Sequence, residues 1–265
     1  MPDPKRALEE ALREASRLLR GWQAPLQVAR KRDQSSVVTA ADTAAEEAIG
    51  RILRAAFPAD ALLGEEKGSS PGASGWTWVV DPLDGTSNFA AALPWYAVLI
   101  ARVDWHGPAL AGIALPAGNT TYLAERGKGA FRDGKPIRVA REQDLANLLV
   151  SYSFDSSPEQ GRTEREARLM GRLAQRCRNV RSLNCAEEFC LAAEGRLGAS
   201  VNQNVRVWDI AAPALLLQEA GATVTDAQGN PFSWPEALAH PQRPLSILAA
   251  NPVVHRNILT LFREG

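Results

Sequence analysis

The chain of 265 residues is long enough for one large α/β domain, or two small ones, around a substantial core. Hydrophobic residues make up 45% and charged residues 23%, and thirty basic residues balance thirty acidic ones. This composition is ordinary for a globular protein and excludes a net field that would attract nucleic acid or an anionic membrane. Any anion that the protein binds must therefore be held by a local arrangement of groups.

Cysteine usage and the amino terminus bear on the cellular setting. The three cysteines, Cys177, Cys185 and Cys190, are odd in number and lack C-x-x-C spacing, which argues against a disulfide framework and a zinc knuckle. No signal peptide is recognisable at the amino terminus, and no run approaches the roughly 18 apolar residues of a membrane span. We therefore expect a cytoplasmic protein in a reducing compartment.

The amino-terminal half is expected to begin with two amphipathic helices and to continue as antiparallel strands. Apolar residues at helical spacing predict helices over 3–22 and 39–57, the second ended by Pro58. A short strand is predicted at 61–63, and the Gly-, Ser- and Pro-rich segment 67–75 is expected to be a mobile loop. Further strands are predicted at 76–80, 95–104, 109–115, 120–125 and 136–139.

The second half alternates between strands and helices. The pattern predicts strands at 148–150, 180–183 and 245–250, and helices at 160–178, 185–194, 208–220 and from Pro252 onward. This alternation indicates an α/β lobe at 146–265 behind an α+β lobe at 1–145, the two forming one compact catalytic unit.

The segment "WTWVVDPLDGTSNF" at 76–89 is the first candidate for chemistry. Its buried strand leads to two carboxylates, Asp81 and Asp84, where a capped turn would need only one. Other acids are expected at the ends of elements: Asp42, Glu65, Glu66 and Asp209. Gathered carboxylates repel one another unless a divalent cation lies among them, and oxygen ligands without His or Cys suit Mg²⁺.

Two other phosphatase types are disfavoured by spacing. A haloacid-dehalogenase-type enzyme carries D-x-D after its strand, whereas this chain has D-x-x-D. Cys190 and Arg196 are spaced as in the C-x5-R of cysteine phosphatases, but the residues between them favour a helix and do not form a glycine-rich anion cradle. Cys190 is therefore expected to be a small core residue.

Four segments together resemble the inositol monophosphatase family. "DPLDGTSNF" (81–89) is similar to its D-P-[IL]-D-G-T-x-N-F signature, and "LLGEE" (62–66) to its upstream G-E-E segment. "VVTAAD" (37–42) resembles its V-T-x-x-D, and "VWDIAAPALLLQEAGATVTD" (207–226) its second signature. The four occur in the family's order over most of the chain, which makes the resemblance specific.

The resemblance implies a Mg²⁺-dependent phosphomonoesterase with a layered αβαβα sandwich fold of the α/β (α+β) class. It further implies two or three Mg²⁺ ions, a homodimer, a small phosphorylated polyol or sugar as substrate, and hydrolysis by a metal-activated water. Neither a nucleic acid nor a membrane is expected as a partner.

The resemblance also carries roles over to residues of this chain. Five oxygen donors match the family's metal ligands: Glu65, Asp81, the main-chain carbonyl of Leu83, Asp84 and Asp209. Asp42 and Thr86, together with Glu65, match the residues that orient the activated water. The amides of Gly85 and Thr86 match those that hold the phosphate, and Glu66 is left outside the metal set.

The match loosens in the segments expected to contact substrate. The family commonly has G-[ST]-A-A where this chain has Asn184, Cys185, Ala186 and Glu187, and inositol phosphatases often carry a substrate-binding Glu where Asn202 stands. The candidate substrate contacts are Gly85, Thr86, Asn184, Cys185, Ala186, Asn202 and Asp209. A helix start can lower the pKa of a thiol such as that of Cys185, although a small wall residue is the expected role.

The substrate therefore stays open at this point. The "TSNF" ending favours an inositol phosphatase over a bisphosphonucleotide (3'-phosphoadenosine-5'-phosphate) phosphatase. Histidinol phosphate and fructose 1,6-bisphosphate remain alternatives, with a preference that is broad or not directed to inositol. A different class of function is a catalytically weak member of the family that serves as a regulatory or binding protein.

Overall fold

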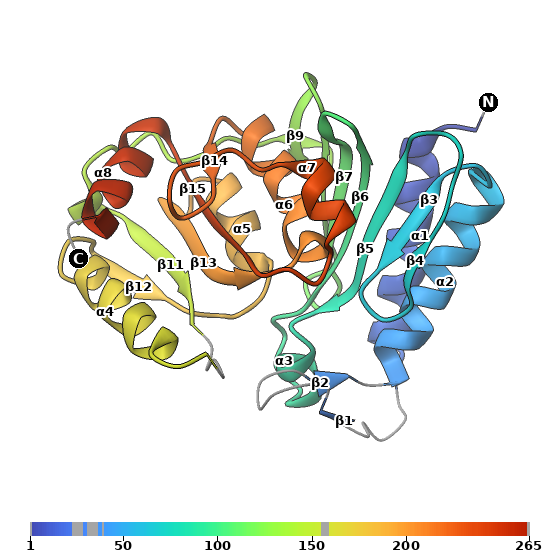
Figure 1. The fold of residues 1–265 in the computed structure, drawn as a ribbon, viewed down its shortest axis with the longest axis horizontal. Helices are drawn as coiled ribbons and strands as arrows, with labels where there is room; N and C mark the ends of the chain where they lie inside the picture. Colours follow the sequence, from blue (N-terminus) through green and yellow to red (C-terminus); the bar gives the residue numbers. More distant parts are fainter. Residues whose placement is uncertain (1, 23–28, 31–36, 39, 155–158, 264–265) are drawn as a thin grey trace.

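The computed structural model describes residues 2–22, 29–30, 37–38, 40–154 and 159–263. Within them the elements form five layers, with alternating helical and sheet layers (Figure 1). The outer helices on one side are α1 (Pro4–Arg20) and α2 (Ala40–Ala56), those in the middle are α5 (Glu187–Ala193) and α6 (Val207–Glu219), and those on the far side are α4 (Arg162–Ala174) and α8 (Pro252–Arg263). This is the predicted αβαβα sandwich.

The first sheet has eight strands in the order β10-β9-β8-β7-β6-β5-β3-β4. Their bounds are β3 (Ala61–Gly64), β4 (Gly68–Ser70), β5 (Thr77–Asp84), β6 (Ala97–Asp104), β7 (Gly107–Leu115), β8 (Thr120–Glu125), β9 (Gly129–Arg132) and β10 (Lys135–Pro136). From β5 to β10 they form an antiparallel meander, while β3 pairs with β5 in parallel. Both faces of the sheet are covered, so Trp78 and Val80 pack towards α1 and α2, and Val79 packs towards α6.

The second sheet has five strands in the order β12-β11-β13-β15-β14. Their bounds are β11 (Leu149–Ser153), β12 (Asn179–Arg181), β13 (Ala199–Val205), β14 (Thr223–Thr225) and β15 (Leu245–Ala250). β11 pairs in parallel with β12 and β13, whereas β15 is antiparallel to both of its neighbours. The predicted strand at 245–250 is confirmed residue for residue.

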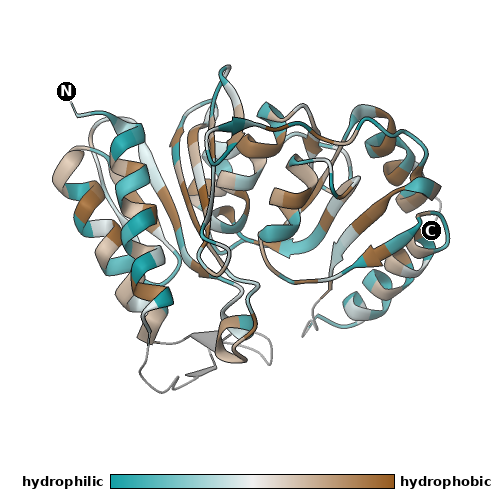
Figure 2. Cartoon of the chain, turned by 180° about the vertical axis from the view of Figure 1, so that it is seen from behind, coloured by the Kyte–Doolittle hydropathy of each residue, from teal (hydrophilic) through white to brown (hydrophobic). Residues whose placement is uncertain are grey.

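Helix α6 joins the two sheets into one core. Its apolar residues form a single buried cluster with residues of the first sheet, such as Leu99, and of the second, such as Ile247 and Ala249. Figure 2 shows hydrophobic residues along the central strands and hydrophilic ones on the outer helices. The buried core is therefore continuous across residue 145, where the division into two lobes stays a prediction.

Several elements differ from the sequence-based expectations. The segment 67–75 is not a plain loop, because Gly68–Ser70 forms the edge strand β4 against β3. The strand expected at 136–139 lies earlier, as the short β9–β10 hairpin. The elements that were not predicted include β9, β13, α3 (Thr86–Ala90) and α7 (Trp234–Ala239). A short pair of strands, β1 (Ala29–Arg30) with β2 (Val37–Val38), and a 3-10 helix, η1 (Leu145–Asn147), complete the described elements.

Two expectations about cysteines and membranes can be compared with the structure. All three cysteines are free thiols with buried side chains. Among the described residues, no helix combines the length and apolar character needed to cross a bilayer.

Candidate active site

The two carboxylates of the opening motif lie at a β-bulge. The sequence predicted a strand that ends at Val80, but β5 continues through Asp84. Its pairing with β6 shifts register between Asp81 and Asp84. An extra residue in one strand bends it and re-aims its side chains, and Pro82 is tolerated at such a position because the ladder there needs no N–H. The amide of Leu83 donates to Oδ1 of Asp81 at 3.0 Å, so the bulge is closed by the carboxylate itself.

Strand pairing brings Glu65 beside Asp81. β3 and β5 are parallel with Gly64 opposite Val80, so the next residues along the two strands, Glu65 and Asp81, are neighbours. The amide of Glu65 donates to the carbonyl of Val80 at 3.2 Å, which extends the pairing by one bond. Two acids that are separate in sequence thus leave the same edge of the sheet together.

Asp42, Leu83 and Thr86 meet at the start of α3. Thr86 Oγ1 lies 2.9 Å from Oδ1 of Asp42, near the start of α2, and 2.9 Å from the carbonyl oxygen of Leu83. Gly85 between them has φ of 81°, and a Cβ there would come within 2.7 Å of the main-chain oxygen of Trp95. Glycine is therefore required, because both the backbone angle and the space exclude a side chain.

Asp209 is brought to the same region by α6. It lies in the first turn of that helix, where its Oδ2 accepts a hydrogen bond from the amide of Arg206 at 2.6 Å. A carboxylate at this position satisfies a free helix N–H and interacts favourably with the helix dipole. Because α6 packs against β5 and β6, the second signature is positioned beside the first.

The electrostatics of the acids identify a cluster. Asp81 is 1% exposed, and burial raises the pKa of its carboxyl well above the usual range, with Glu65, Asp84 and Asp209 raising it further. Burial likewise raises the pKa of Asp209, followed by the charges of Glu65 and Asp84. The four predicted acidic metal ligands therefore lie close enough to repel one another.

The donor chemistry of this cluster fits a hard divalent cation. It offers carboxylate oxygens and the carbonyl of Leu83, which are the oxygen donors that Mg²⁺ prefers. Across the described residues, no three or more His, Cys, Asp or Glu side chains already stand at ligand spacing. The mutual pKa effects show that these acids are neighbours, although their side chains do not converge on one point.

The predicted substrate segment of the second half adjoins this cluster. The amide of Ala186 donates a hydrogen bond to Oδ2 of Asp84. Cys185 is buried, and burial together with the charge of Asp84 raises the pKa of its thiol well above the usual range. The lowered pKa considered for Cys185 is thus wrong, because desolvation and a neighbouring carboxylate outweigh any effect of the helix start.

Asn184 and Cys190 have structural contacts. Asn184 has a positive φ of 51°, and its Nδ2 donates to the carbonyl of Phe154 at 3.0 Å, which links the segment to the end of β11. Cys190 is fully buried, and burial raises the pKa of its thiol, so its predicted role as a core residue is confirmed. Contact of Asn184 with a substrate stays a prediction.

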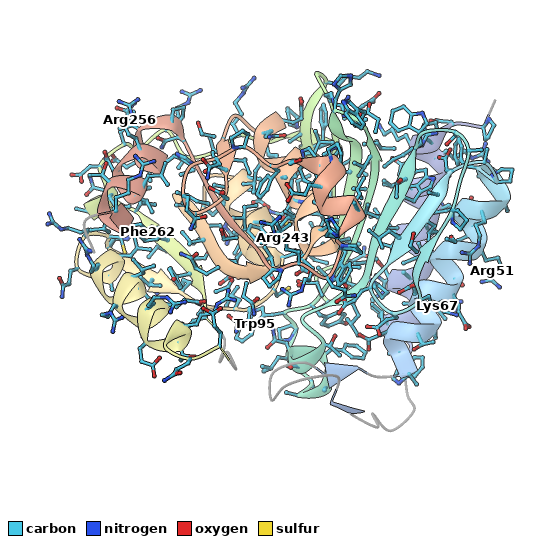
Figure 3. All side chains as sticks on the ribbon, viewed as in Figure 1. Arg51, Lys67, Trp95, Arg243, Arg256 and Phe262 are labelled. Atoms are coloured by element: carbon cyan, nitrogen blue, oxygen red, sulfur yellow. The ribbon has the colours of Figure 1, made fainter. Side chains whose placement is uncertain are left out.

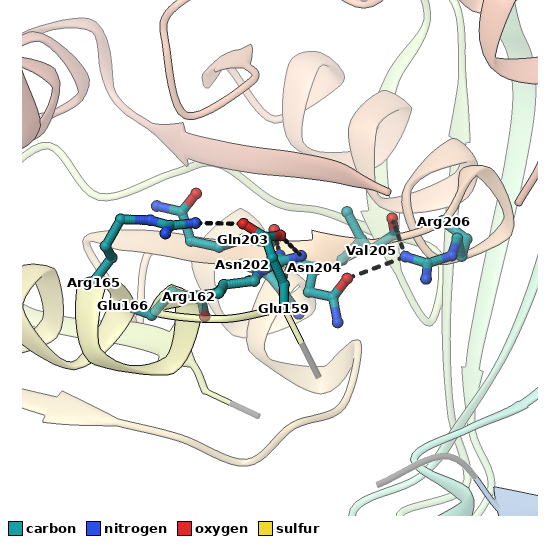
Figure 4. A network of polar contacts seen from close by, with 9 residues as sticks. All are labelled: Glu159, Arg162, Arg165, Glu166, Asn202, Gln203, Asn204, Val205 and Arg206. Atoms are coloured by element: carbon teal, nitrogen blue, oxygen red, sulfur yellow. Dashed lines mark hydrogen bonds and ion pairs between the residues drawn. The ribbon is translucent and has the colours of Figure 1, made fainter. Parts of the chain in front are cut away.

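Asn202 lies on the irregular end of β13 that leads to α6 (Figure 4). Its Oδ1 accepts a hydrogen bond from the amide of Asn204 at 2.9 Å, and the side chain of Asn204 accepts one from Arg206 at 3.1 Å. Arg162 of α4 donates to the carbonyl of Gln203, which holds the segment from the other side. A local role for Asn202 is established by these contacts, whereas a role in substrate recognition stays a prediction.

Three residues that carry the site were not singled out in the sequence. Asn88 of α3 donates through Nδ2 to the carbonyls of Trp95 at 2.9 Å and Leu183 at 2.8 Å, so it ties the opening motif to the second half; Figure 3 marks Trp95 between the two halves. Glu188 accepts a bond from the amide of Leu183 at 2.6 Å. Glu46 follows Asp42 by one helical turn. The signal for the last two was an acidic residue on an otherwise apolar helix face.

The general class of this protein is an αβαβα sandwich in which acids from strand β5, the β3–β4 turn and the start of α6 form one cluster. The family model "Inositol monophosphatase family" matches residues 5–264, and the chain belongs to this family of Mg²⁺-dependent phosphomonoesterases. The resemblance read from the four motifs is thereby confirmed.

Individual relatives carry different names. The chain is 35% identical over 265 residues to an inositol-1-monophosphatase of Caulobacter vibrioides, covering 97% of this chain and 99% of the relative. It is 34% identical over 231 residues to a histidinol-phosphatase of Mycobacterium tuberculosis, covering 86% and 85%. Among solved structures, the extragenic suppressor protein suhB of Bartonella henselae superimposes with a TM-score of 0.89 at 27% identity, covering 98% of each chain.

Proposed function

We propose that this protein hydrolyses the phosphate monoester of a small polyol or sugar in a Mg²⁺-dependent reaction. The observation that carries the proposal is the cluster of four acids in which Glu65, Asp84 and Asp209 all raise the pKa of the buried Asp81. Buried carboxylates of like charge are costly, and they are retained where a cation compensates them. Membership of the family supports the same reaction class.

In this reaction one set of residues would bind the metal and another would position the attacking water. Glu65, Asp81, Asp84, Asp209 and the carbonyl of Leu83 would hold Mg²⁺. When bound there, Mg²⁺ supplies positive charge for the phosphate oxygens and lowers the pKa of a coordinated water. The Thr86 hydroxyl, held by its contact with Asp42, would orient the attacking water, and the amides of Gly85 and Thr86 would face the phosphate.

No protein nucleophile is needed for such a reaction. Phosphoryl transfer depends mainly on positioning and on electrostatic stabilisation. The nearest thiol to the cluster, that of Cys185, has a raised pKa and is therefore protonated near neutrality. A covalent thiol intermediate is disfavoured on this ground.

The direct test is phosphate release with and without Mg²⁺. We expect activity towards a panel of sugar, inositol, histidinol and nucleotide phosphates to vanish with EDTA and to return when Mg²⁺ is added in excess. Absence of Mg²⁺-dependent release from every member of the panel would instead support the alternative of a regulatory or binding protein. Assembly as a homodimer and a cytoplasmic location stay predictions.

The identity of the substrate is expected to depend on position 202. A carboxylate there would accept charge-assisted hydrogen bonds from sugar hydroxyls, each worth roughly 1.5–3 kcal/mol, whereas Asn offers one neutral acceptor and a donor. We therefore expect the wild type to accept inositol 1-phosphate without strong selectivity. Asn202→Glu should raise kcat/KM for inositol 1-phosphate, relative to phosphomonoesters without a polyol, about tenfold.

A matched control for this variant is Asn204→Glu, which places the same charge two residues along the chain. The comparison is kcat/KM for each substrate in wild type and both variants. A wild type that prefers inositol 1-phosphate by orders of magnitude would refute the assignment, as would an Asn202→Glu variant that leaves every ratio unchanged.

A further inference from the structure

Glu46 is a buried carboxylate for which the reaction described above has no role. It lies on the inward face of α2, one turn after Asp42, and it is 1% exposed. Its two oxygens accept hydrogen bonds from consecutive amides: Oε2 from Glu66 at 2.8 Å and Oε1 from Lys67 at 3.0 Å. The carboxylate thus binds the main chain of the β3–β4 turn rather than a side chain.

The fit between this carboxylate and the turn is close. A Cβ added to Gly64 would lie 2.1 Å from Oε1 of Glu46 and 2.5 Å from its carboxyl carbon. Contacts this short are not possible, so glycine is the residue that lets the turn approach the carboxylate. The turn therefore accommodates the Glu46 carboxylate in two ways: it presents two amide donors, and it has no side chain at Gly64.

The turn that Glu46 binds is the one that carries Glu65. On one side, the amide of Glu65 is bonded to the carbonyl of Val80 in β5. On the other side, the next two amides are bonded to Glu46. The main chain is therefore held at Glu65 and directly after it, which fixes the point from which the Glu65 side chain leaves the sheet.

Helix-to-sheet packing alone does not require an acid at this position. Burying a carboxylate costs free energy unless its hydrogen bonds are satisfied, and an apolar residue would fill the same space more cheaply. The charge of Glu65 adds to the burial in raising the pKa of Glu46, so the two acids also repel each other. The two amide hydrogen bonds offset part of this cost, and both come from the turn, which points to a function in the placement of the turn.

We propose that Glu46 is a positioning residue, which holds the β3–β4 turn so that Glu65 is preorganised for binding Mg²⁺. The proposal rests on the proposed function, in which Glu65 is a metal ligand. Groups that orient metal ligands from behind typically change metal affinity or activity by about 10–100-fold when they are replaced. Glu46 would act in this way through the main chain of Glu66 and Lys67.

The neighbouring Glu47 provides a matched control. It is exposed, and its carboxylate forms an ion pair with Lys67 Nζ at 2.6 Å on the outer surface, where Figure 3 labels Lys67. Exposed ion pairs of this kind contribute little to the free energy of unfolding. Glu46→Gln and Glu47→Gln therefore make the same chemical change at adjacent positions that both contact Lys67, and only the first removes a hydrogen bond to the main chain.

The experiment combines a metal-free and a metal-bound measurement. In Glu46→Gln the side-chain NH₂ faces one of the two amides and loses that bond, so hydrogen exchange at Glu66 or Lys67 should be about tenfold faster without metal. Mg²⁺ affinity measured by calorimetry should fall about tenfold. At saturating Mg²⁺, kcat should return to within about threefold of wild type, because the bound state then restores the position of Glu65. Glu47→Gln should change none of these quantities.

The other possible outcomes distinguish a failure of the positioning role of Glu46 from a failure of the proposed function. Wild-type exchange and wild-type Mg²⁺ affinity in Glu46→Gln would overturn the positioning role while leaving the proposed function in place. A wild type that binds no Mg²⁺ would overturn the proposed function itself, although the exchange data would still report whether Glu46 holds the turn. If Glu46→Gln does not fold, Glu46→Asp is measured instead, because it keeps the charge but withdraws it from both amides; unchanged Mg²⁺ affinity in that variant would likewise overturn the proposal.

Discussion

Asp209→Asn is expected to lower kcat/KM for Mg²⁺-dependent phosphate release about a thousandfold. A metal ion contributes several kcal/mol to stabilising the charge of the transition state, and each 1.36 kcal/mol corresponds to a tenfold change in rate. Asn keeps the size of the side chain but removes the negative charge from a residue whose pKa is raised by the charges of Glu65 and Asp84. The measurement is steady-state phosphate release over a range of Mg²⁺ concentrations.

The fold of this variant should remain intact. The oxygen of an Asn side chain can still accept the hydrogen bond from the amide of Arg206, so the first turn of α6 keeps its cap. Asp226→Asn is the matched control, since Asp226 also accepts main-chain bonds, from Gln228 and Asn230, but lies in the turn after β14. Near-normal turnover in Asp209→Asn would show that the assigned metal ligands are wrong.

Asp81→Asn is expected to stabilise the metal-free protein and to remove most of its stabilisation by Mg²⁺. The variant removes a buried charge that is repelled by three neighbours, while its Oδ1 can still accept from the amide of Leu83. A gain of about 1 kcal/mol, or roughly 2–4 °C in Tm, would follow without metal. Wild type should gain about 5–10 °C from Mg²⁺ at a hundred times its Kd, and the variant should lose most of that gain.

Asp60→Asn is a control variant in which the metal-free Tm is expected to change in the opposite direction. Asp60 is also a buried carboxylate, but it is paired with Arg102 at 2.8 Å, so neutralising it leaves a cation without its partner. The Tm of this variant should fall, and its response to Mg²⁺ should stay that of wild type. A metal-free Asp81→Asn protein that melts below wild type at pH 8 would contradict the repulsion on which the metal assignment rests.

The same repulsion predicts how stability depends on pH. The pKa values of Asp81 and Asp209 are raised in the folded protein above the unfolded value of about 4, so between those values the folded state binds more protons. These two groups do not destabilise the fold below the unfolded pKa, and their destabilisation grows as pH rises towards the folded pKa. The difference in metal-free Tm between Asp81→Asn and wild type should therefore widen as pH is raised, and Mg²⁺ should narrow it.

Local patterns in the sequence were sufficient for a large part of the architecture and for the list of acids. Apolar spacing of 3.6 residues predicted α1 and α2, and the apolar run before Asp81 predicted a buried strand. The acids of the two signatures could be named from motif spacing alone, because a motif is a property of neighbouring residues. Family membership follows from the same four segments.

Other features depend on contacts between distant residues, and only the tertiary structure decided them. β4 and β13 contain Gly, Ser, Asn and Gln, which disfavour strands, yet each is held by pairing with partners elsewhere in the chain. The pKa of Cys185 rises because burial and Asp84 outweigh its place near a helix start. The sequence places Glu46 as an acid on an apolar helix face, but its hydrogen bonds to the β3–β4 turn exist only once α2 lies against that turn.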